Sequence, residues 1–219
     1  MRCLVGVALL CSTAHADFEE KGVRAGPVVF AMSRDDNGQS TGQEAIISRP
    51  GWMVGAWMTW RKSDMFALQL ETALSNKILR TELCGTGAAS CMTTADISLY
   101  YLEVPFLLRL DLLPNATKFF VAVGAEGAIT LGGGRTPKEG DDFERFEDLV
   151  PFNLGGVLGI GLEVPAGPGK LAFDFRYKRW FVPITRSLDE DAPPVGFSDG
   201  EQDIKPSHHV MLTAGYAFP

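Results

Sequence analysis

A strict alternation of apolar and polar residues constrains the fold of this chain more than any other feature. Between Ser98 and Leu110 the even-numbered positions from Tyr100 onward are apolar or aromatic, whereas the odd-numbered positions include Glu103 and Arg109. A period of two is typical of a β-strand with one apolar face, because successive side chains of a strand point to opposite sides of the sheet. A helix, with its period of about 3.6 residues, cannot produce this pattern.

The alternation recurs along most of the sequence. It is clear in 65–75, 98–110, 171–178 and 210–218, and weaker in 23–32, 52–60, 118–131 and 152–164. These eight segments predict eight strands of about nine to fourteen residues. The connections between them alternate between long ones (33–50, 76–96, 132–150 and 181–206) and short ones (61–64, 111–117 and 165–170).

Four long and three short connections in strict alternation predict an all-β fold, an eight-stranded antiparallel up-and-down transmembrane β-barrel. Both chain ends and the short turns are expected in the periplasm, and the long loops outside the cell. A soluble barrel of the lipocalin type would instead turn its apolar faces inward around a ligand. In this chain the face opposite the apolar one carries many charges, which favours a polar lumen and a lipid-facing outer surface.

Composition excludes several other classes of protein. The 219 residues suit one domain, and 14 Phe and 4 Trp exclude a disordered chain. No apolar run reaches the length of about 18 residues that a transmembrane helix needs. A formal net charge of −7 argues against nucleic acid as a partner. Aromatic residues at expected strand ends predict two girdles at the membrane interfaces, although high β-propensity also explains them: Trp52, Tyr100 and Phe152 outside, and Trp60, Phe119 and Phe218 inside.

The first sixteen residues predict a cleaved secretory signal peptide. Arg2 precedes an apolar stretch from Cys3 to Cys11, and Ala14-His15-Ala16 is a typical cleavage site. The mature barrel domain is then expected to span 17–219. A lipoprotein signal would use Cys11, but the bulky Leu10 before it does not fit that type of signal.

Two cysteines remain in the expected mature chain, Cys84 and Cys91. In an exported protein we expect them to form a disulfide that closes the second long loop. The alternative is a metal site, but the histidines of the mature chain lie far along the sequence at 208 and 209, and no second cysteine pair exists.

Charged residues on the inward face form the first candidate site. Because eight strands enclose little more than side chains, opposite charges there are expected to pair and plug the lumen. Three carboxylates, Glu71, Glu103 and Glu126, fall at similar heights along their strands, and we expect Arg176 to be their main counter-charge. The alternative is a narrow path for ions or protons. The predicted lumen network comprises Glu71, Glu103, Arg109, Glu126, Glu163, Asp174, Arg176 and Lys178, with Arg24 as a further base.

Other candidates for chemistry are weaker. His208 and His209 follow Ser207, Asp203 and Glu201, the residue types of a lipid hydrolase, but adjacency in sequence does not supply the geometry of a catalytic triad. A hydrated loop end is the simpler interpretation. The acidic runs at 35–38, 141–148 and 189–191 do not match a calcium-loop pattern. We therefore expect no catalytic residue, no metal and no cofactor.

Several motifs resemble one family. Tyr101-Leu102-Glu103-Val104-Pro105-Phe106-Leu107-Leu108-Arg109, followed by Phe119-Phe120-Val121-Ala122-Val123-Gly124, resembles the PorT-like outer-membrane β-barrel family of Gram-negative bacteria. Gly159-Ile160-Gly161-Leu162-Glu163 and Phe173-Asp174-Phe175-Arg176-Tyr177 look like its last hairpin, so that the resemblance covers about residues 22 to 218. It implies a small eight-stranded barrel inserted by the outer-membrane assembly machinery, without a settled biochemical activity.

The sequence thus predicts a non-enzymatic protein of the cell outer membrane. We expect a monomer in contact with outer-membrane lipid, with extracellular loops that serve envelope integrity or bind a partner or surface. A small porin and an outer-membrane lipid hydrolase are the alternatives.

Overall fold

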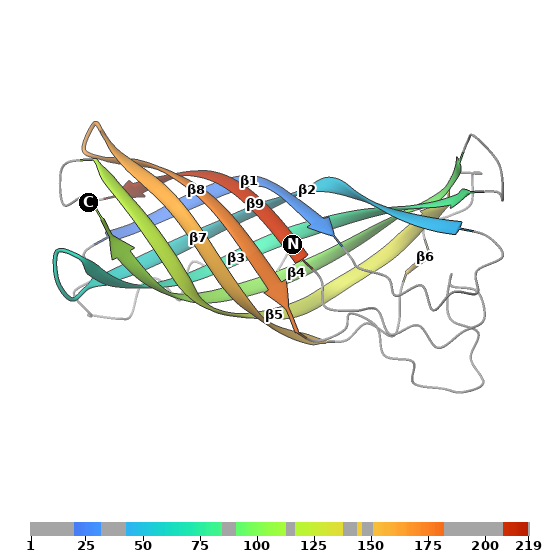
Figure 1. Ribbon diagram of the computed structural model, residues 1–219, viewed down its shortest axis with the longest axis horizontal. Coiled ribbons are helices and arrows are strands. Elements are labelled where there is room, and N and C mark those ends of the chain that lie inside the picture. Colours follow the sequence, from blue (N-terminus) through green and yellow to red (C-terminus); the bar gives the residue numbers. More distant parts are fainter. Residues whose placement is uncertain are drawn as a thin grey trace, which may run out of the picture.

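The computed structural model describes residues 20–31, 43–84, 91–112, 117–137, 144–145, 151–181 and 208–218. Its strands form a closed antiparallel barrel (Figure 1). The predicted fold class is confirmed. The barrel strands are β1 (Glu20–Ala31), β2 (Gln43–Arg61), β3 (Phe66–Cys84), β4 (Cys91–Asp111), β5 (Lys118–Pro137), β7 (Phe152–Ala166), β8 (Gly169–Trp180) and β9 (His208–Phe218); β6 (Glu144–Arg145) is a two-residue strand.

Each barrel strand pairs with the barrel strands before and after it in the chain, and β1 pairs with β9 to close the barrel. The strand β6 lies outside this circle and pairs only with Gly134 and Arg135 of β5. This arrangement is the up-and-down topology that the alternating connections predict. It leaves no unpaired edge along the body of the barrel.

The two ends of the barrel differ. The short connections β2–β3, β4–β5 and β7–β8 all lie at one end, together with the start of β1 and the end of β9; we call it the turn end. The β7–β8 connection is a tight turn in which Gly167 has a φ of 60°, a left-handed conformation that glycine adopts without steric cost. We call the opposite end the loop end.

Four neighbouring strands are longer than the sequence predicts. Strands β2, β3, β4 and β5 have 19, 19, 21 and 20 residues, whereas the other barrel strands have 11 to 15. In Figure 1 these four strands project past the ends of β1, β8 and β9. The long connections expected at 33–50, 76–96 and 132–150 are correspondingly shorter. Strand pairing continues beyond the alternating segments, because backbone hydrogen bonds do not require one face to be apolar.

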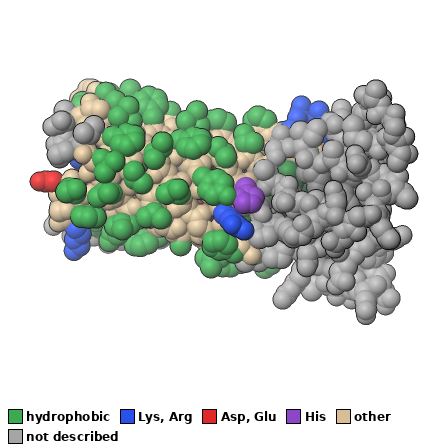
Figure 2. All heavy atoms as spheres, viewed as in Figure 1, with side chains coloured by type: hydrophobic (Ala, Val, Ile, Leu, Met, Phe, Trp, Pro, Cys, Tyr) green, Lys and Arg blue, Asp and Glu red, His purple; other side chains and the backbone are tan. Residues whose placement is uncertain are grey.

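The two faces of the wall are sorted as the alternation predicts. Along β8 the odd-numbered residues from Leu171 to Tyr177 are exposed on the outside, and the even-numbered residues from Ala172 to Lys178 are buried inside. On the face shown in Figure 2, apolar side chains cover the barrel body, and charged ones lie near its two ends. Within the described residues, no helix is long and apolar enough to span a membrane.

Candidate functional site

The lumen is filled by charged side chains that lie in three layers along the barrel axis. The layer nearest the turn end centres on Arg109 of β4. Its Nε donates to Asp111 Oδ1 at 2.7 Å, and a terminal nitrogen bonds Glu163 of β7. Lys170 Nζ of β8 donates to Glu20 Oε1 of β1 at 2.8 Å. This turn-side layer contains three acids and three bases: Glu20, Asp111, Glu163, Arg61, Arg109 and Lys170.

The middle layer contains two acids and two bases. Arg176 of β8 donates from Nη1 and Nη2 to the two carboxylate oxygens of Glu71 of β3, at 2.7 and 2.8 Å. Arg176 Nη2 also donates to Asp174 at 3.1 Å. Arg24 of β1 bonds Asp174 and lies 3.3 Å from Glu71, and the Trp57 ring centre is 4.2 Å from its guanidinium carbon. Each charge in this layer therefore has at least two opposite charges in contact or close to it.

The loop-side layer also contains two acids and two bases. Lys178 of β8 bonds Glu126 of β5 and donates to Glu103 of β4 at 2.5 Å. Lys77 Nζ of β3 lies 3.0 Å from Glu103 Oε1, which also accepts a hydrogen bond from Ser75 Oγ at 2.6 Å. All four charged side chains are almost completely buried.

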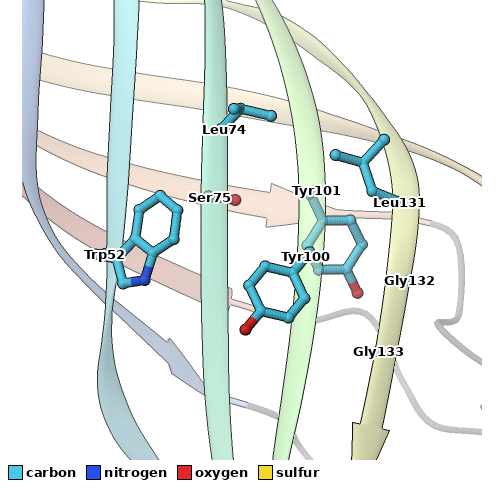
Figure 3. Close-up of a pocket in the computed structure, with 8 residues that line it drawn as sticks. All are labelled: Trp52, Leu74, Ser75, Tyr100, Tyr101, Leu131, Gly132 and Gly133. Carbon is cyan, nitrogen blue, oxygen red and sulfur yellow. The ribbon is translucent and has the colours of Figure 1, made fainter. Parts of the chain in front are cut away.

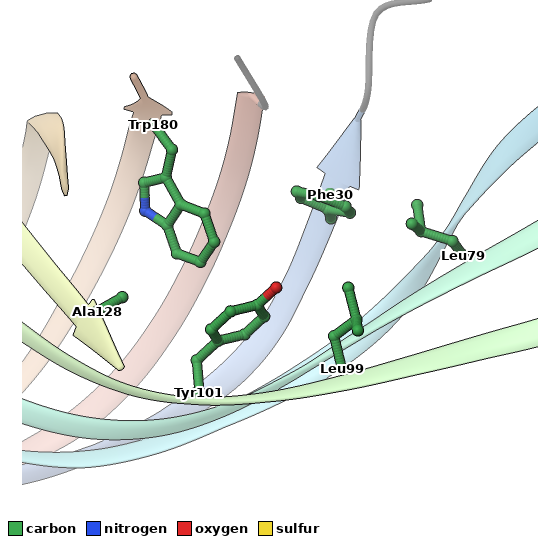
Figure 4. Close-up of a cluster of buried hydrophobic side chains, with 6 residues drawn as sticks. All are labelled: Phe30, Leu79, Leu99, Tyr101, Ala128 and Trp180. Carbon is green, nitrogen blue, oxygen red and sulfur yellow. The ribbon is translucent and has the colours of Figure 1, made fainter. Parts of the chain in front are cut away.

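An aromatic cluster covers the loop-side layer. Figure 4 shows Phe30, Tyr101 and Trp180 pointing toward one another inside the barrel. The ring centres of Tyr101 and Trp180 are 4.8 Å apart. Lys77 Nζ lies 3.3 Å from the Trp180 ring centre, and Trp180 Nε1 donates to Glu126 Oε1 at 2.9 Å. The aromatic cluster consists of Phe30, Leu79, Leu99, Tyr101, Ala128 and Trp180.

Acids and bases balance in the middle and loop-side layers, and Lys118 of β5 is a further base close to the turn-side layer, which explains how so many charges share a narrow interior. A single unpaired charge in low dielectric costs several kcal/mol, whereas paired and hydrogen-bonded charges recover most of that free energy. Some of the pairs, such as Arg176–Glu71 and Lys178–Glu103, also cross the lumen between strands that are not neighbours. Among the described residues, these ion pairs therefore link strands on opposite sides of the barrel.

The structure brings together the residues that the sequence singled out, but with different partners than expected. All eight predicted network residues are buried inside the barrel. Arg176 contacts Glu71 as predicted, whereas Lys178 takes the role expected of Arg176 at Glu103 and Glu126. The prediction for Arg176 was wrong on those two carboxylates because Lys178 lies two residues closer to the loop end, at their height.

Five members of the network were missed: Glu20, Arg61, Lys77, Asp111 and Lys170. Each lies at or beyond a predicted strand boundary, so that the sequence assigned it to a connection or left it outside a strand. Lys77 and Asp111 continue the inward alternation of Ser75 and Arg109 by two residues. Extending the period of two past the last apolar residue would have found them.

The adjacent histidines begin β9 and face opposite sides of the wall. His209 is completely buried, with its ring centre 4.4 Å from that of Trp180 and 4.7 Å from that of Phe30. His208 contacts the Tyr177 hydroxyl on the outside. The interpretation as a hydrated loop end was therefore wrong for His209, because strand β9 starts at His208 and turns the next side chain inward. Ser207, Asp203 and Glu201 lie outside the described residues.

The sequence suggested two possible roles for Cys84 and Cys91, a disulfide and, as the alternative, a metal site. In the described part of the chain, no group of three or more His, Cys, Asp or Glu side chains could hold a metal ion. The backbone register places Cys84 directly opposite Cys91 across β3 and β4. The structure describes the backbone of Cys84 and Cys91 but not their side chains, so the disulfide stays a prediction.

This barrel is similar in fold to solved structures of outer membrane proteins. Solved structures with the same fold include OprG from Pseudomonas aeruginosa, which is 13% identical with a TM-score of 0.50 over 91% of this chain and 95% of that one. Neisserial surface protein A is 12% identical with a TM-score of 0.46 over 91% and 95%. The outer membrane protease OmpT from Escherichia coli is 10% identical with a TM-score of 0.45 over 94% and 99%.

Similarity at these identities concerns the fold and does not extend to activity. No curated protein sequence matches this chain. Residues 20–185, well over half of the chain, match the family described as "Outer membrane protein beta-barrel domain". The chain therefore belongs to the outer membrane protein beta-barrel domain family, which places it in the outer membrane.

Proposed function

We propose that this protein is a non-enzymatic, non-conducting outer-membrane barrel that presents its loop end to the cell exterior for envelope integrity or surface contacts. The observation that carries the proposal is the filled lumen. Ion pairs cross the lumen in three layers, and the aromatic cluster covers the last of them. A small porin needs a continuous water column through the lumen, and these side chains occupy the space that the water would fill.

The projecting strands support a role at the loop end. A strand tilted across a bilayer needs about 9 to 11 residues, whereas β2 to β5 have 19 to 21. The surplus residues form a sheet that projects past the ends of β1, β8 and β9 on one side of the barrel (Figure 1), and in the proposed orientation this sheet lies outside the membrane. Such a sheet is a rigid platform on which loops can contact a surface or a partner.

Several finer points belong to the same proposal. The protein is exported by a signal peptide cleaved after Ala16, leaving a barrel domain of 17–219, and is inserted as a monomer by the outer-membrane assembly machinery of a Gram-negative cell. The motif around Tyr101 to Arg109 supports a PorT-like relationship within the wider family. The charged network of Glu71, Glu103, Arg109, Glu126, Glu163, Asp174, Arg176 and Lys178 serves as a structural plug.

Planar-bilayer recording tests the closed lumen. Purified protein is reconstituted beside a channel-forming barrel as positive control, and we expect no discrete conductance steps. As a matched comparison, Glu71→Ala with Arg176→Ala removes one cross-lumen pair without leaving an unpaired charge, and should conduct more than wild type. Regular conductance steps in the wild-type protein would overturn the proposal and favour the porin.

A deletion strain tests the role in the envelope. Loss of the protein should increase the sensitivity of cells to detergents, and the full chain should restore resistance. A chain with a shortened connection between β5 and β7 should fold but restore resistance poorly. Lipid mass spectrometry of the same strain addresses the hydrolase alternative, since accumulation of an uncleaved lipid would contradict a non-enzymatic role.

A further inference from the structure

The outer wall of the barrel differs between its two halves in the polar groups that it carries. Across β2 to β5 the wall has a hollow of about 390 Å³, which Figure 3 shows lined by residues such as Trp52, Tyr100 and Gly132. No charged side chain lines this hollow, so it does not select a ligand by charge. The other half, formed by β7, β8, β9 and β1, carries Arg179 and His208 near the loop end. We call these two residues the basic pair.

The outward face of β1, β7, β8 and β9 is otherwise almost entirely apolar. Exposed side chains such as Val23, Leu158, Phe175 and Leu212 cover it. Within the described residues of these four strands, the basic side chains on that face are Lys21 at the turn end and the basic pair, and no carboxylate lies there. The basic pair therefore has no acidic neighbour on its own wall.

Strand register and a hydrogen bond hold the basic pair together. Arg179 of β8 lies directly opposite His208 of β9, so that their side chains are neighbours on the outward face. The Tyr177 hydroxyl bonds His208 Nδ1, and the two ring centres are 5.8 Å apart. Figure 2 shows a histidine beside a basic side chain, with apolar side chains around them. Tyr177 thus orients the imidazole and leaves Nε2 as the ring nitrogen that can bond a ligand.

Both members of the basic pair have donors to spare in the described structure. No hydrogen bond or ion pair engages the Arg179 guanidinium, and the bond to Tyr177 is the hydrogen bond that engages the His208 ring. A charge on an apolar wall attracts an opposite charge more strongly than it does in bulk water, because the local dielectric constant is lower. The basic pair is therefore suited to an anionic group that lies against the wall.

The basic pair lies at the height where acyl chains end and lipid headgroups begin. Gly169 starts β8 at the turn end, and Arg179 lies ten residues further, about 33 Å along the strand. At a strand tilt of about 40°, that length crosses roughly 25 Å, which is the height of the apolar band of outer-membrane barrels. Tyr177 and Phe181 flank Arg179 on the outward face and are 39 and 58% exposed. An aromatic girdle of this kind is typical of the membrane interface.

A lipid phosphate is the anion expected at this height. The apolar wall below the basic pair contacts acyl chains, because the chain belongs to an outer-membrane family and exposes apolar side chains there. Phosphate is the anionic group that membrane lipids carry next to their acyl chains. Arginine binds it well because its planar fork of donors matches phosphate geometry, and an imidazole N–H supplies a further donor from the neighbouring strand.

We propose that Arg179 and His208 bind the phosphate of one anionic membrane lipid, and that Tyr177 positions His208 for this contact. The Tyr177 hydroxyl donates to Nδ1, so that Nε2 carries the ring proton and donates to one phosphate oxygen, while the guanidinium donates to the others. The inference concerns the leaflet that faces the loop end, whichever side of the membrane that is. It goes beyond the proposed function, because neither the closed lumen nor the loop contacts require it.

Native mass spectrometry of the folded, detergent-purified protein titrated with phosphatidylglycerol tests the contact. Arg179→Gln should weaken binding about tenfold. Lys62→Gln is the matched control, because it removes the same charge from an exposed side chain in the β2–β3 connection, away from this wall. An uncharged galactolipid with the same acyl chains should bind the wild type about as weakly as phosphatidylglycerol binds Arg179→Gln. Equal affinities of the two variants for phosphatidylglycerol would overturn the proposal.

A double-mutant cycle tests the positioning role of Tyr177. Tyr177→Phe and His208→Gln should each weaken phosphatidylglycerol binding about threefold. The double variant should bind no more weakly than His208→Gln alone, because Tyr177 acts through the imidazole. Heat-dependent gel mobility checks that each variant is folded. Losses that multiply to about ninefold in the double variant would refute the positioning role.

Two further measurements test the lipid as the source of the phosphate. Inorganic phosphate should displace phosphatidylglycerol poorly, and displacement as effective as that by phosphatidylglycerol itself would overturn the choice of a lipid. In vesicles, a spin label at Arg179→Cys should be far more accessible to a water-soluble relaxation agent than one at Phe175→Cys, both with Cys84 and Cys91 replaced by Ser. Equal accessibility would put position 179 among the acyl chains and contradict the proposal. These measurements do not depend on conductance, so their failure leaves the closed-lumen proposal standing.

Discussion

Arg176 of β8 and Glu71 of β3 form a doubly hydrogen-bonded ion pair across the full width of the barrel, with N–O distances of 2.7 and 2.8 Å. Around the barrel, β8 and β3 are separated by three strands on either side. Side chains from opposite walls therefore meet in the lumen. The barrel body is braced internally by ion pairs as well as by the hydrogen bonds of its wall.

Replacing Arg176 should destabilise the barrel strongly. Arg176→Met leaves Glu71 with one fewer partner in a buried layer, and breaking a buried pair typically costs about 3 to 5 kcal/mol. We expect that loss in the free energy of unfolding, measured by urea titration in lipid vesicles. Arg179→Met, three residues along on the exposed face, is the control and should change stability little. Equal stability of the two variants would mean that water already screens the lumen.

Two lysines of β8 should differ in their contribution to stability. Lys178 contacts Glu103 and Glu126 in a fully buried layer, whereas Lys170 contacts Glu20 and Glu163 with 28% of its side chain exposed. We expect Lys178→Met to lower the free energy of unfolding by about 3 to 5 kcal/mol. Lys170→Met should lower it by no more than about 1 kcal/mol, because solvent screens its pairs.

The same urea titration compares the two lysine variants side by side. A loss for Lys170→Met as large as that for Lys178→Met would contradict the prediction. It would show that the turn-side layer is as dry as the loop-side layer.

Cys84 and Cys91 should be joined by a disulfide. Residues directly opposite in an antiparallel pair have Cα atoms about 4.5 to 5.5 Å apart, which falls within the range that a disulfide spans; Cys84 and Cys91 are such a pair. Protein purified without reductant should resist alkylation until it is reduced, as seen by mass spectrometry. The double Ser variant should still fold, since the bridge closes only a short loop. Free thiols in the unreduced protein would refute the bridge.

Orientation can be tested by labelling intact cells with a membrane-impermeant thiol reagent. In a background with Cys84 and Cys91 replaced by Ser, Gly140→Cys should be labelled and Pro114→Cys should not, because position 140 lies in a long connection and position 114 in a short one. Both variants should be labelled after cells are lysed, which controls for expression. The reverse pattern on intact cells would place the loop end in the periplasm and contradict the proposed orientation.

The inward and outward faces of the barrel could be predicted from sequence because they follow from a local rule. Successive strand residues face opposite sides, and a barrel in lipid must turn its apolar side outward. Glu103 and Arg109 are inward for that reason alone, as are Asp174 and Arg176. Strand ends could not be predicted in the same way, and Lys77 was missed because hydrogen-bonded pairing continues where the apolar pattern stops.

The sequence by itself determined the number of strands, the topology, the lipid-facing surface and the identity of most lumen charges. Only the tertiary structure decided which charge meets which. Partners such as Arg176 and Glu71 lie 105 residues apart in the chain, and their heights depend on strand register and tilt, which no local pattern records. A shift of two residues along one strand exchanges Arg176 for Lys178 at Glu103. The pairing within the lumen is therefore a property of the closed barrel, because closure alone sets the positions of opposite walls.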